Sequence, residues 1–319
     1  MEKWEKSTMK DNPIYIVGLD RSGKTLLRLA LSAHPHLALT RRTYMWSRVY
    51  QRFGNLANKE NFERCFSAML QQKTIRQFAV DENRIRHEFH QGETSYANLF
   101  ALFHRQFAEK IGKMRWGEQA GLTEAYAPEI IKAFPFVKII HMVRDPRNRC
   151  EEILNSTPAR IRAGKIGALT ASWLFSARLA LRYQKEYPNH YKVVNYETLL
   201  TSPEKTMKEI CAFIDEEFVP EMLSLETSNH LGDNEEANLN PQKIWTQDVI
   251  NFDPGQQKSL QLEEASFIQT HTKNEMELLG YKILKIKIPI YKKLGLVFNW
   301  PFNLIRMATW QVFETRLVQ

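Results

Sequence analysis

The pattern of apolar and polar positions in the first part of the chain predicts a buried strand followed at once by a helix. Residues 14–17 are all apolar or aromatic, which is typical of a short strand covered on both faces. Polar residues and glycines dominate positions 18–25. After them the apolar residues return with the spacing of one helix face: Leu26, Leu27, Leu29, Ala30 and Leu31. This part of the chain therefore predicts a strand, a polar loop and a helix.

Three further segments predict the fold class. Residues 137–143 suit a second buried strand, and residues 165–187 show helical spacing of their apolar members. Residues 44–115 are rich in Phe, Arg and Gln and predict a mostly helical insertion between the two strands. Strands separated by helices predict an α/β fold of three layers, in which helices flank a mostly parallel central sheet. Ligands of such sheets lie at the carboxyl ends of the strands.

The polar loop after the first strand carries a complete phosphate-binding motif. Gly18 to Thr25 matches G-x-x-x-x-G-K-[ST], in the strand, loop and helix context that this motif requires. Backbone N–H groups of such a loop and the positive end of the helix dipole bind an anion, and the glycines allow the tight turn. Arg21 and Lys24 add full charges, and either Thr25 or Ser22 adds a hydroxyl group. The loop predicts a bound nucleotide-like phosphate.

The second strand is followed by Arg144-Asp145-Pro146-Arg147. A kinase that uses ATP and Mg²⁺ normally has an aspartate directly after such a strand to hold the metal. Here an arginine comes first, and a guanidinium group clamps anions and does not bind cations. Two separated anion-binding ends favour a nucleotide with phosphates at both ends over ATP with Mg²⁺, so no metal is expected.

Four blocks of this sequence resemble those of sulfotransferases that use 3′-phosphoadenosine 5′-phosphosulfate (PAPS). The family's R-S-G-T-T-L-L-R with a following A-H-P is similar to residues 21–28 and 33–35, and its W-G-E-K-T-P to residues 116–121. Its F-P-x-A-K-F-I-x-x-V-R-D-P-R is similar to residues 134–147, and its V-x-Y-E-x-L-x-x-x-P-E to residues 194–204. The chain is most similar to the bacterial and tyrosylprotein-type members.

The resemblance implies a P-loop sulfotransferase that moves a sulfuryl group in line from PAPS to a hydroxyl or amine, with PAP as the product. It implies that Arg144 clamps the 3′-phosphate and that Lys24 and Arg21 stabilise charge on the leaving phosphate. Glu118 is the expected general base. The cofactor-binding residues that the resemblance implies are Arg21, Ser22, Gly23, Lys24, Thr25, Leu26, Arg144, Glu152, Tyr196 and Lys243.

Several positions depart from the family pattern. Lys24 replaces a threonine of the loop, and Gln119 replaces the lysine of the W-G-E-K block. Residues 40–43 lack the acid that follows the first helix in tyrosylprotein-type relatives. Glu152 stands where a serine usually helps to hold the 3′-phosphate, and its carboxylate repels a phosphate unless it pairs with a cation such as Arg149. These changes leave room for a protein with weakened catalysis.

The resemblance places one sulfotransferase-like domain at residues 1–285 and acceptor recognition in its insertion, residues 44–115. Six arginines of this region suit either an acidic acceptor or a solvated basic face: Arg41, Arg42, Arg48, Arg52, Arg84 and Arg86. Trp173 suits either the core or stacking on adenine, and His141 is expected to pack on its strand. Lys243 is the cation of a polar loop where the family closes a flap over the cofactor.

Residues 286–319 lie beyond the family match and form a basic, aromatic tail. Its cations are Lys287, Lys292, Lys293, Arg306 and Arg316, against Glu314 alone. This composition suits peripheral contact with the inner face of a membrane, or docking onto the domain or onto a second subunit of a homodimer. Pro289 and Pro301 interrupt the tail, so no long spanning helix is predicted.

Composition narrows the partners and the compartment. The 319 residues are 43% hydrophobic, enough for a full core, and the net charge of +8 fits a polyanionic cofactor. No nucleic-acid-binding motif is visible, so the expected partner is a small-molecule, glycan or lipid acceptor and not nucleic acid. Cys65, Cys150 and Cys211 are far apart and predict free thiols in a reducing compartment. Residues 1–13 show no signal peptide, so the expected location is cytoplasmic.

Three functions stay open from the sequence. The first is an active sulfotransferase that depends on PAPS. The second is a P-loop kinase that phosphorylates a small metabolite, which would need Mg²⁺ and turn over ATP. The third is a sulfotransferase-fold binding protein without catalysis, motivated by Gln119, Glu152 and the missing acid near Arg42.

Overall fold

The computed structural model describes residues 12–121, 123–156, 165–224, 245, 259–288 and 300–309. Within these residues five strands form one sheet: β1 (Ile14–Val17), β2 (Leu37–Thr40), β3 (Arg115–Gln119), β4 (Lys138–Val143) and β5 (Tyr191–Asn195). Their order is β2-β3-β1-β4-β5, and each neighbouring pair is parallel. Because β1 is the central strand, the loop that follows it emerges between the ends of β3 and β4. The predicted α/β fold with a parallel sheet is confirmed.

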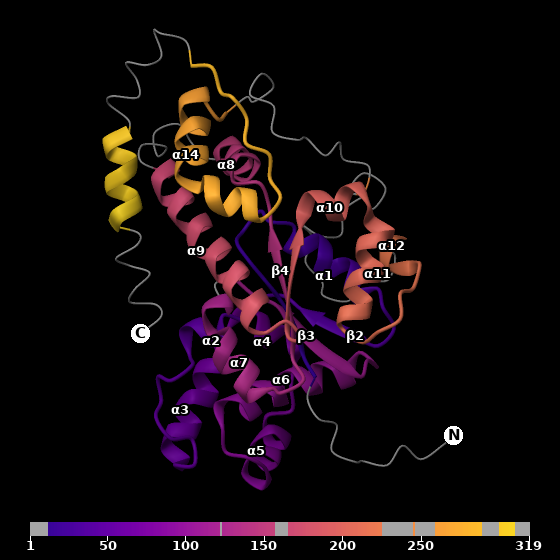
Figure 1. Cartoon of the computed structure of the whole chain (residues 1–319). Helices are drawn as coiled ribbons and strands as arrows, with labels where there is room; N and C mark the ends of the chain where they lie inside the picture. The colour runs from indigo at the N-terminus through magenta and orange to yellow at the C-terminus, as the bar shows by residue number, and fades with distance from the viewer. Residues whose placement is uncertain are drawn as a thin grey trace.

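Helices cover both faces of this sheet (Figure 1). One face carries α1 (Lys24–Ser32), α10 (Tyr196–Thr201), α11 (Pro203–Phe213) and α12 (Glu221–Ser224). Ile14 and Ile16 of β1 belong to the apolar cluster on this face, and Tyr15 and Val17 belong to the cluster on the other face. That second face carries the inserted helices and α9 (Lys165–Glu186). Burial on both faces explains why the sequence of β1 is an unbroken apolar run.

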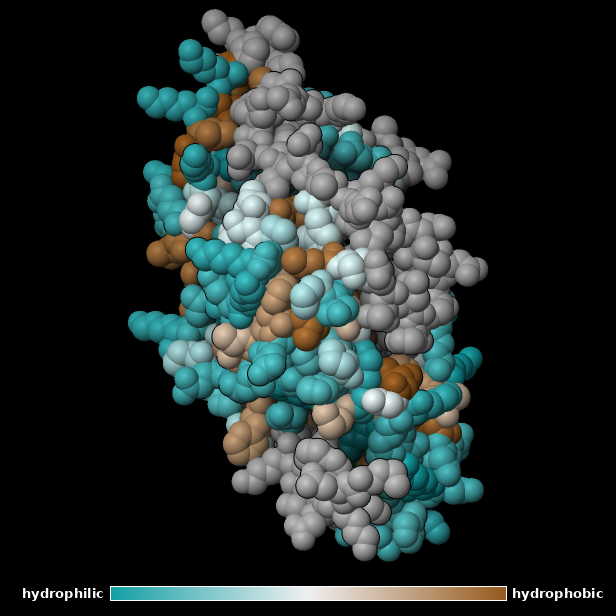
Figure 2. Space-filling model, turned by 90° about the vertical axis from the view of Figure 1, so that its right-hand side faces the viewer, coloured by the Kyte–Doolittle hydropathy of each residue, from teal (hydrophilic) through white to brown (hydrophobic). Residues whose placement is uncertain are grey.

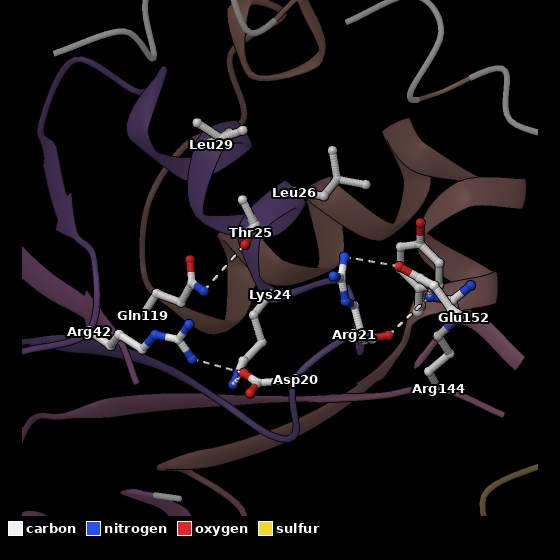
Figure 3. Close-up of a pocket in the computed structure, with 12 residues that line it drawn as sticks. Asp20, Arg21, Lys24, Thr25, Leu26, Leu29, Arg42, Gln119, Arg144 and Glu152 are labelled. Atoms are coloured by element: carbon white, nitrogen blue, oxygen red, sulfur yellow. Dashed lines mark hydrogen bonds and ion pairs between the residues drawn. The ribbon is translucent and has the colours of Figure 1, made fainter. Parts of the chain in front are cut away.

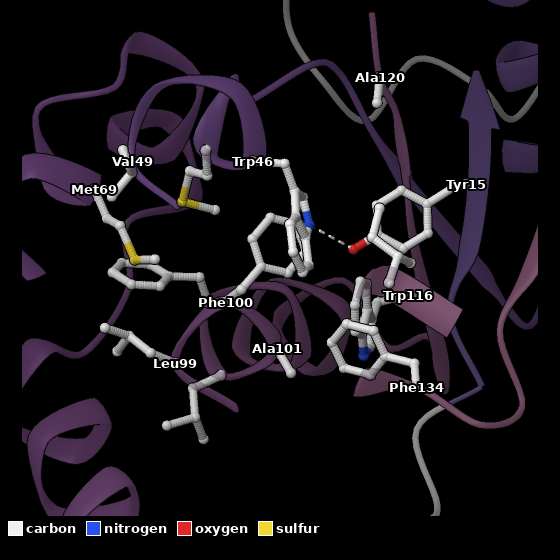
Figure 4. Close-up of a cluster of buried hydrophobic side chains, with 14 of the residues drawn as sticks. Tyr15, Trp46, Val49, Met69, Leu99, Phe100, Ala101, Trp116, Ala120 and Phe134 are labelled. Atoms are coloured by element: carbon white, nitrogen blue, oxygen red, sulfur yellow. Dashed lines mark hydrogen bonds between the residues drawn. The ribbon is translucent and has the colours of Figure 1, made fainter. Parts of the chain in front are cut away.

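The inserted segment is helical, as its sequence predicts. It contains α2 (Met45–Arg48), α3 (Lys59–Leu70), α4 (Lys73–Phe78), α5 (Glu82–Gln91) and α6 (Tyr96–Lys110). The side chains of Asn58, Asp81 and Ser95 accept first-turn N–H groups of α3, α5 and α6, so these residues set where the helices begin. Aromatic side chains join the insertion to the sheet (Figure 4), where Trp46 Nε1 donates to the Tyr15 hydroxyl at 3.0 Å.

Four further helical elements lie around the sheet. They are η1 (Thr123–Tyr126), α7 (Ala127–Ala133), α8 (Pro146–Asn155) and α14 (Leu262–Leu278). The apolar pattern predicts β1, β4 and α9 but does not predict β2, β3 or β5. β3 reads R-W-G-E-Q and β5 reads Y-K-V-V-N, so polar residues interrupt their apolar positions. Pairing with the central strands, more than local sequence, makes these segments strands.

The described residues of the tail are 286–288, which have no regular secondary structure, and a helix at residues 300–309 that packs on α9 and α14. Trp300 lies edge-on to Phe267 of α14, with 5.2 Å between the ring centroids. The Asn303 side chain accepts the Gly167 N–H of α9 at 3.0 Å. The same helix also exposes three apolar side chains, those of Phe302, Leu304 and Ile305. Trp300 and Asn303 dock this helix onto the rest of the protein. Contact of its exposed apolar side chains with a membrane stays a prediction.

The molecular surface on the side of α10 and α11 is mainly hydrophilic where described residues are visible (Figure 2). Among the described residues, no helix combines the length and the apolar character needed to cross a membrane. Cys65, Cys150 and Cys211 are buried and free, as the sequence predicts.

Candidate functional site

The loop between β1 and α1 is enclosed tightly by its neighbours. Gly18 and Gly23 have φ angles of 116° and 91°, in the left-handed region that glycine tolerates best. A Cβ on Gly18 would lie 2.3 Å from the Met142 carbonyl oxygen, and one on Gly23 would lie 2.2 Å from the Tyr196 ring. Arg21 also has a positive φ, 67°, which is strained for a residue with a side chain. The motif needs its glycines both for the turn and for close contact with β4 and α10.

A cavity of about 720 Å³ opens beside this loop (Figure 3), and its size suits a nucleotide. Its lining comprises Asp20, Arg21, Gly23, Lys24, Thr25, Leu26, Leu29, Arg42, Gln119, Arg144, Glu152 and Tyr196. The charged side chains gather at two ends, as Figure 3 shows. What we call the lysine end holds Lys24, Asp20, Arg42 and Gln119. What we call the arginine end holds Arg21, Arg144 and Glu152, together with Tyr196, whose ring lies against Arg144.

Arg144 is held at the arginine end by contacts with three elements. It follows β4 directly, and its Nη1 donates to the carbonyl oxygen of Arg21 in the loop at 3.0 Å. Its guanidinium carbon lies 4.7 Å from the centre of the Tyr196 ring. From α9, Trp173 Nε1 donates to the Arg144 carbonyl oxygen at 2.9 Å. Trp173 is buried in the core and lies outside the cavity lining, so it supports the strand end.

Glu152 of α8 brings an opposite charge to the arginine end. Its carboxylate pairs with Arg144 Nη1 and, at 3.3 Å, with Arg21 Nη1. The sequence suggests Arg149 as a partner, but Arg149 is buried and its Nε donates to the Asp20 carbonyl oxygen at 2.9 Å. The ion pairs of Glu152 therefore join α8 to the ends of β4 and the loop.

Asp145 and Arg147 have structural contacts. Asp145 caps α8, because its carboxylate accepts the Arg147 N–H at 2.8 Å. The same carboxylate accepts the Nε–H of Arg147 at 3.0 Å and its Nη2–H at 2.6 Å, and the Arg147 side chain is fully buried. Asp145 is thus committed to a buried ion pair. It stands beside the position where a kinase would hold its metal.

Lys24 is buried at the lysine end, with 4% of its surface exposed. Its ammonium group donates to the carbonyl oxygens of Gly18 and, at 3.2 Å, Ala120, and lies 3.9 Å from an Asp20 oxygen. Burial lowers the pKa of Lys24, while Glu124 and Asp20 act in the opposite direction. The ends of β1 and β3, which the sheet brings together, therefore position this charge.

Gln119 and Arg42 extend the lysine end. Gln119 Nε2 donates to the Thr25 hydroxyl at 3.3 Å, and Gln119 Oε1 accepts from Arg28 Nε at 3.0 Å. Arg42 pairs with Asp20 at 3.0 Å. A neutral amide therefore stands where the family pattern has a lysine, and Lys24 and Arg42 carry the positive charge of this end.

Glu118, the expected base, is not among the residues that line this cavity. It precedes Gln119 on β3, so its side chain points to the opposite face, towards the inserted helices. Its Oε1 accepts the N–H of Thr43 and, at 2.8 Å, the Thr43 hydroxyl. The residue is 2% exposed, and burial raises the pKa of its carboxyl group to about 7. Its catalytic role stays a prediction, now on the side of the sheet that faces the insertion.

Other predicted residues have different positions. Leu26 lines the cavity, whereas the Ser22 hydroxyl is buried and donates to the Leu19 carbonyl oxygen at 2.7 Å. Lys243 lies outside the described residues. His141 is fully buried on β4, as expected.

Sequence reasoning did not assign Asp20, Arg42, Gln119 or Leu29 to the cofactor site. Arg42 and Gln119 lie at the ends of β2 and β3, which bring them beside the loop. The carboxyl ends of parallel strands are the signal that could have found them, had these strands been predicted. Arg84 and Arg86, by contrast, pair with glutamates of the inserted helices.

A group of potential metal ligands, His34, His36 and Glu216, lies beyond the end of α1 and outside the cavity lining. Their ligand atoms all lie within 4.8 Å of one another. His34 Nδ1 accepts the His36 N–H at 3.2 Å, so neutral His34 carries its proton on Nε2, which donates to the Glu217 carbonyl oxygen at 3.1 Å. A metal on Nε2 would move that proton to Nδ1, against the backbone N–H. Hydrogen bonding within the protein accounts for this group.

Comparison with known proteins agrees with this geometry. The sulfotransferase family model matches residues 13–220, well over half of the chain. The chain belongs to the sulfotransferase family. The matched region of this sulfotransferase contains every residue that lines the cavity. A comparison with curated proteins gave no match.

Solved structures share the sulfotransferase fold. The sulfotransferase domain of the Synechococcus PCC 7002 olefin synthase has a TM-score of 0.54 at 20% identity, covering 89% of this chain and 100% of that chain. The sulfotransferase domain from the curacin biosynthetic pathway has a TM-score of 0.52 at 19% identity, covering 86% and 99%. Sulfotransferase STF9 from Mycobacterium avium has a TM-score of 0.51 at 12% identity, covering 86% and 78%. At these identities the likeness concerns the fold and says nothing of the acceptor.

Proposed function

We propose that this protein moves a sulfuryl group from PAPS to a hydroxyl or amine of an acceptor and releases PAP. The observation that carries the proposal is the presence, in one cavity, of the phosphate loop and of Arg144 from the neighbouring strand. N–H donors at the start of α1 suit the 5′-phosphosulfate, and a separate guanidinium group suits the 3′-phosphate. ATP has no phosphate at that second position.

The net charge of the cavity lining is opposite in sign to that of PAPS. Four cations line it, Arg21, Lys24, Arg42 and Arg144, against two acids, Asp20 and Glu152. Its positive balance favours a ligand with several negative charges. Its acids lie close to its cations, so neither carboxylate stands alone as a metal ligand.

PAPS, when bound, supplies the activated sulfuryl group. The loop N–H groups, Arg21 and Thr25 would hold the phosphosulfate, and Lys24 would stabilise the charge that develops on the leaving phosphate. Glu118 would accept the proton of the acceptor as the new bond to sulfur forms. A carboxyl group with a pKa of about 7 suits a general base near neutral pH. Glu118 and Gln119 are successive residues of β3 and point to opposite faces of the sheet. Glu118 would be the base on the face of the insertion, and Gln119 lines the cofactor cavity on the other face.

The acceptor is expected on the side of the inserted helices, which Glu118 faces. A second cavity, of about 220 Å³, lies in this region. Its lining comprises Val49, Tyr50, Gln51, Phe53, Gly54, Asn55, Leu56, Cys65, Thr94 and Tyr96. The apolar and aromatic side chains suit a small aromatic or apolar group, and the polar ones could contact a polar substituent of it, so the acceptor class stays small-molecule, glycan or lipid.

Thermal unfolding with PAP, ADP·Mg²⁺ and ATP·Mg²⁺ tests the proposal. A ligand that binds the native state raises the melting temperature by an amount that grows with its affinity. PAP in the presence of EDTA should raise it more than either magnesium nucleotide. A rise with ATP·Mg²⁺ alone would support a kinase instead, although Asp145 is already committed to Arg147.

A further inference from the structure

The carboxylate of Glu152 occupies the arginine end of the cavity. It lies 3.3 Å from Arg21 Nη1 and against Nη1 of Arg144. Arg144 Nη1 also donates to the Arg21 carbonyl oxygen, so one terminal nitrogen already serves two acceptors. Figure 3 shows Arg21, Arg144 and Glu152 gathered at one side of the loop. An anion that enters this end meets guanidinium groups that are already paired.

A carboxylate and a phosphate compete for the same donors. Both present oxygens with a negative charge to the N–H groups of arginine. If Glu152 keeps its place, a phosphate beside it is repelled, and if the phosphate takes the arginines, the carboxylate must leave. The displaced carboxylate has solvent to move into, because the Glu152 side chain is 37% exposed. Its pair with Arg21, which is 53% exposed, costs little to break, whereas Arg144 is 19% exposed and its pair with Glu152 is the stronger restraint.

Resting on the proposed function, we propose that Glu152 competes with the 3′-phosphate of the donor for Arg144. It thereby sets how strongly the protein prefers a 3′-phosphorylated nucleotide to one with a free 3′-hydroxyl group. Competition weakens the binding of the phosphate and does not prevent it, since the displaced carboxylate has solvent to move into.

The carboxylate should not oppose a nucleotide that lacks the 3′-phosphate. A hydroxyl group can donate to a carboxylate, as ribose hydroxyls do to the acid of dinucleotide-binding folds. Removing the charge of Glu152 therefore affects the two ligands differently. The binding of PAP strengthens, and the binding of 5′-AMP stays the same or weakens. Glu152 is thus a specificity-determining residue for the donor.

Calorimetric titration with PAP and with 5′-AMP, both in EDTA, tests this assignment on the whole chain. The proteins are wild type, Glu152→Gln, Glu152→Ser and the control Glu186→Gln. Glu186 pairs with Arg182 at 2.8 Å and is also a surface carboxylate, but it lies outside the cavity lining. We expect both Glu152 variants to bind PAP about tenfold more tightly than wild type, with 5′-AMP changed less than about twofold. The control should match wild type with both ligands.

The outcomes separate this inference from the proposed function. If wild type and both Glu152 variants bind PAP equally or the variants bind it more weakly, Glu152 is no competitor and the inference fails, while the proposed function stands. If 5′-AMP gains affinity in parallel with PAP, the effect is general electrostatics and the inference also fails. If none of the proteins binds PAP although all melt cooperatively, the proposed function is wrong and the inference falls with it.

Discussion

At the arginine end of the cavity, Arg21 and Arg144 meet the carboxylate of Glu152 near the surface, whereas at the lysine end Lys24 is buried among backbone carbonyl groups. Because the Glu152 side chain is 37% exposed, its carboxylate has solvent to move into when an anionic ligand binds Arg144 as proposed. A buried charge held by the fold is already oriented before a ligand arrives. We therefore expect the arginine end to govern affinity, and the lysine end, together with Glu118 on the other face of β3, to govern rate.

Replacing Glu118, the proposed base, should give the largest loss in rate. Glu118→Gln keeps the size of the side chain and an oxygen for the Thr43 donors, but it cannot take a proton. Sulfuryl transfer should slow by about 10²–10⁴-fold, while the affinity for PAP stays near that of wild type. Steady-state kinetics measure the loss in rate, and calorimetry on the same preparation measures the affinity for PAP. Full turnover by this variant with the true acceptor would place the base elsewhere, on the inserted helices.

Removing the lysine should also lower the rate. Lys24→Ala should slow transfer by about 10²–10³-fold, because it removes a fixed charge beside the leaving phosphate. The control is Lys208→Ala, which removes an exposed lysine that pairs with Glu204. If Lys24→Ala instead raises KM and leaves kcat unchanged, the lysine serves binding alone. The assignment of rate to the lysine end and affinity to the arginine end would then be wrong.

Changes at the arginine end should lower the affinity for PAP and not the rate of transfer. Arg144→Ala should cost about 2–4 kcal/mol in PAP affinity, as expected for a lost charge-assisted clamp on the phosphate. The matched control is Arg182→Ala, because Arg182 also pairs with a glutamate and lies over a tyrosine ring, but outside the cavity lining. Equal losses in the two variants would show that the effect is not specific to the site.

The last expected effect is on stability and not on ligand binding or rate, and it concerns the burial of Glu118. Its pKa is raised from 4.5 to about 7 in the folded state, so the folded state holds the proton more tightly than the unfolded state. The resulting stabilisation, about 3 kcal/mol, is complete below about pH 4.5 and is lost as the pH rises through 7.

Glu118→Gln cannot ionise, so the melting temperature of this variant relative to wild type should increase from pH 5 to pH 8. Thermal melts of wild type, Glu118→Gln and the exposed control Glu204→Gln check this. The same difference at both pH values would show that Glu118 titrates normally and is no poised base.

The sequence could predict the loop and Arg144 because each lies in a contiguous motif whose context is local. Residues 18–25 stand between an apolar run and a helix pattern, and Arg144 follows the clearest second strand. Both elements of the fold that position them, β1 and β4, are buried on both faces and therefore carry an unmistakable apolar pattern.

The lysine end could not be predicted in the same way, because it is assembled by pairing between distant strands. Arg42 follows β2, and Gln119 ends β3, which pairs with β2 only after the long insertion. The partners of Glu152 show the same limit. The sequence offered Arg149 as an example of a pairing cation, but the structure brings Arg21 to Glu152 across 131 positions of the chain. Contacts between residues so far apart in the sequence form only in the folded chain, so a local sequence pattern does not predict them.

The most direct test of the account is the affinity of wild-type protein for PAP and for 5′-AMP, measured by calorimetry in EDTA. The two ligands differ only in the 3′-phosphate that Arg144 is proposed to bind. The account predicts that PAP binds more tightly than 5′-AMP and needs no divalent metal. Equal affinity for both nucleotides, or binding only when Mg²⁺ is added, would contradict it.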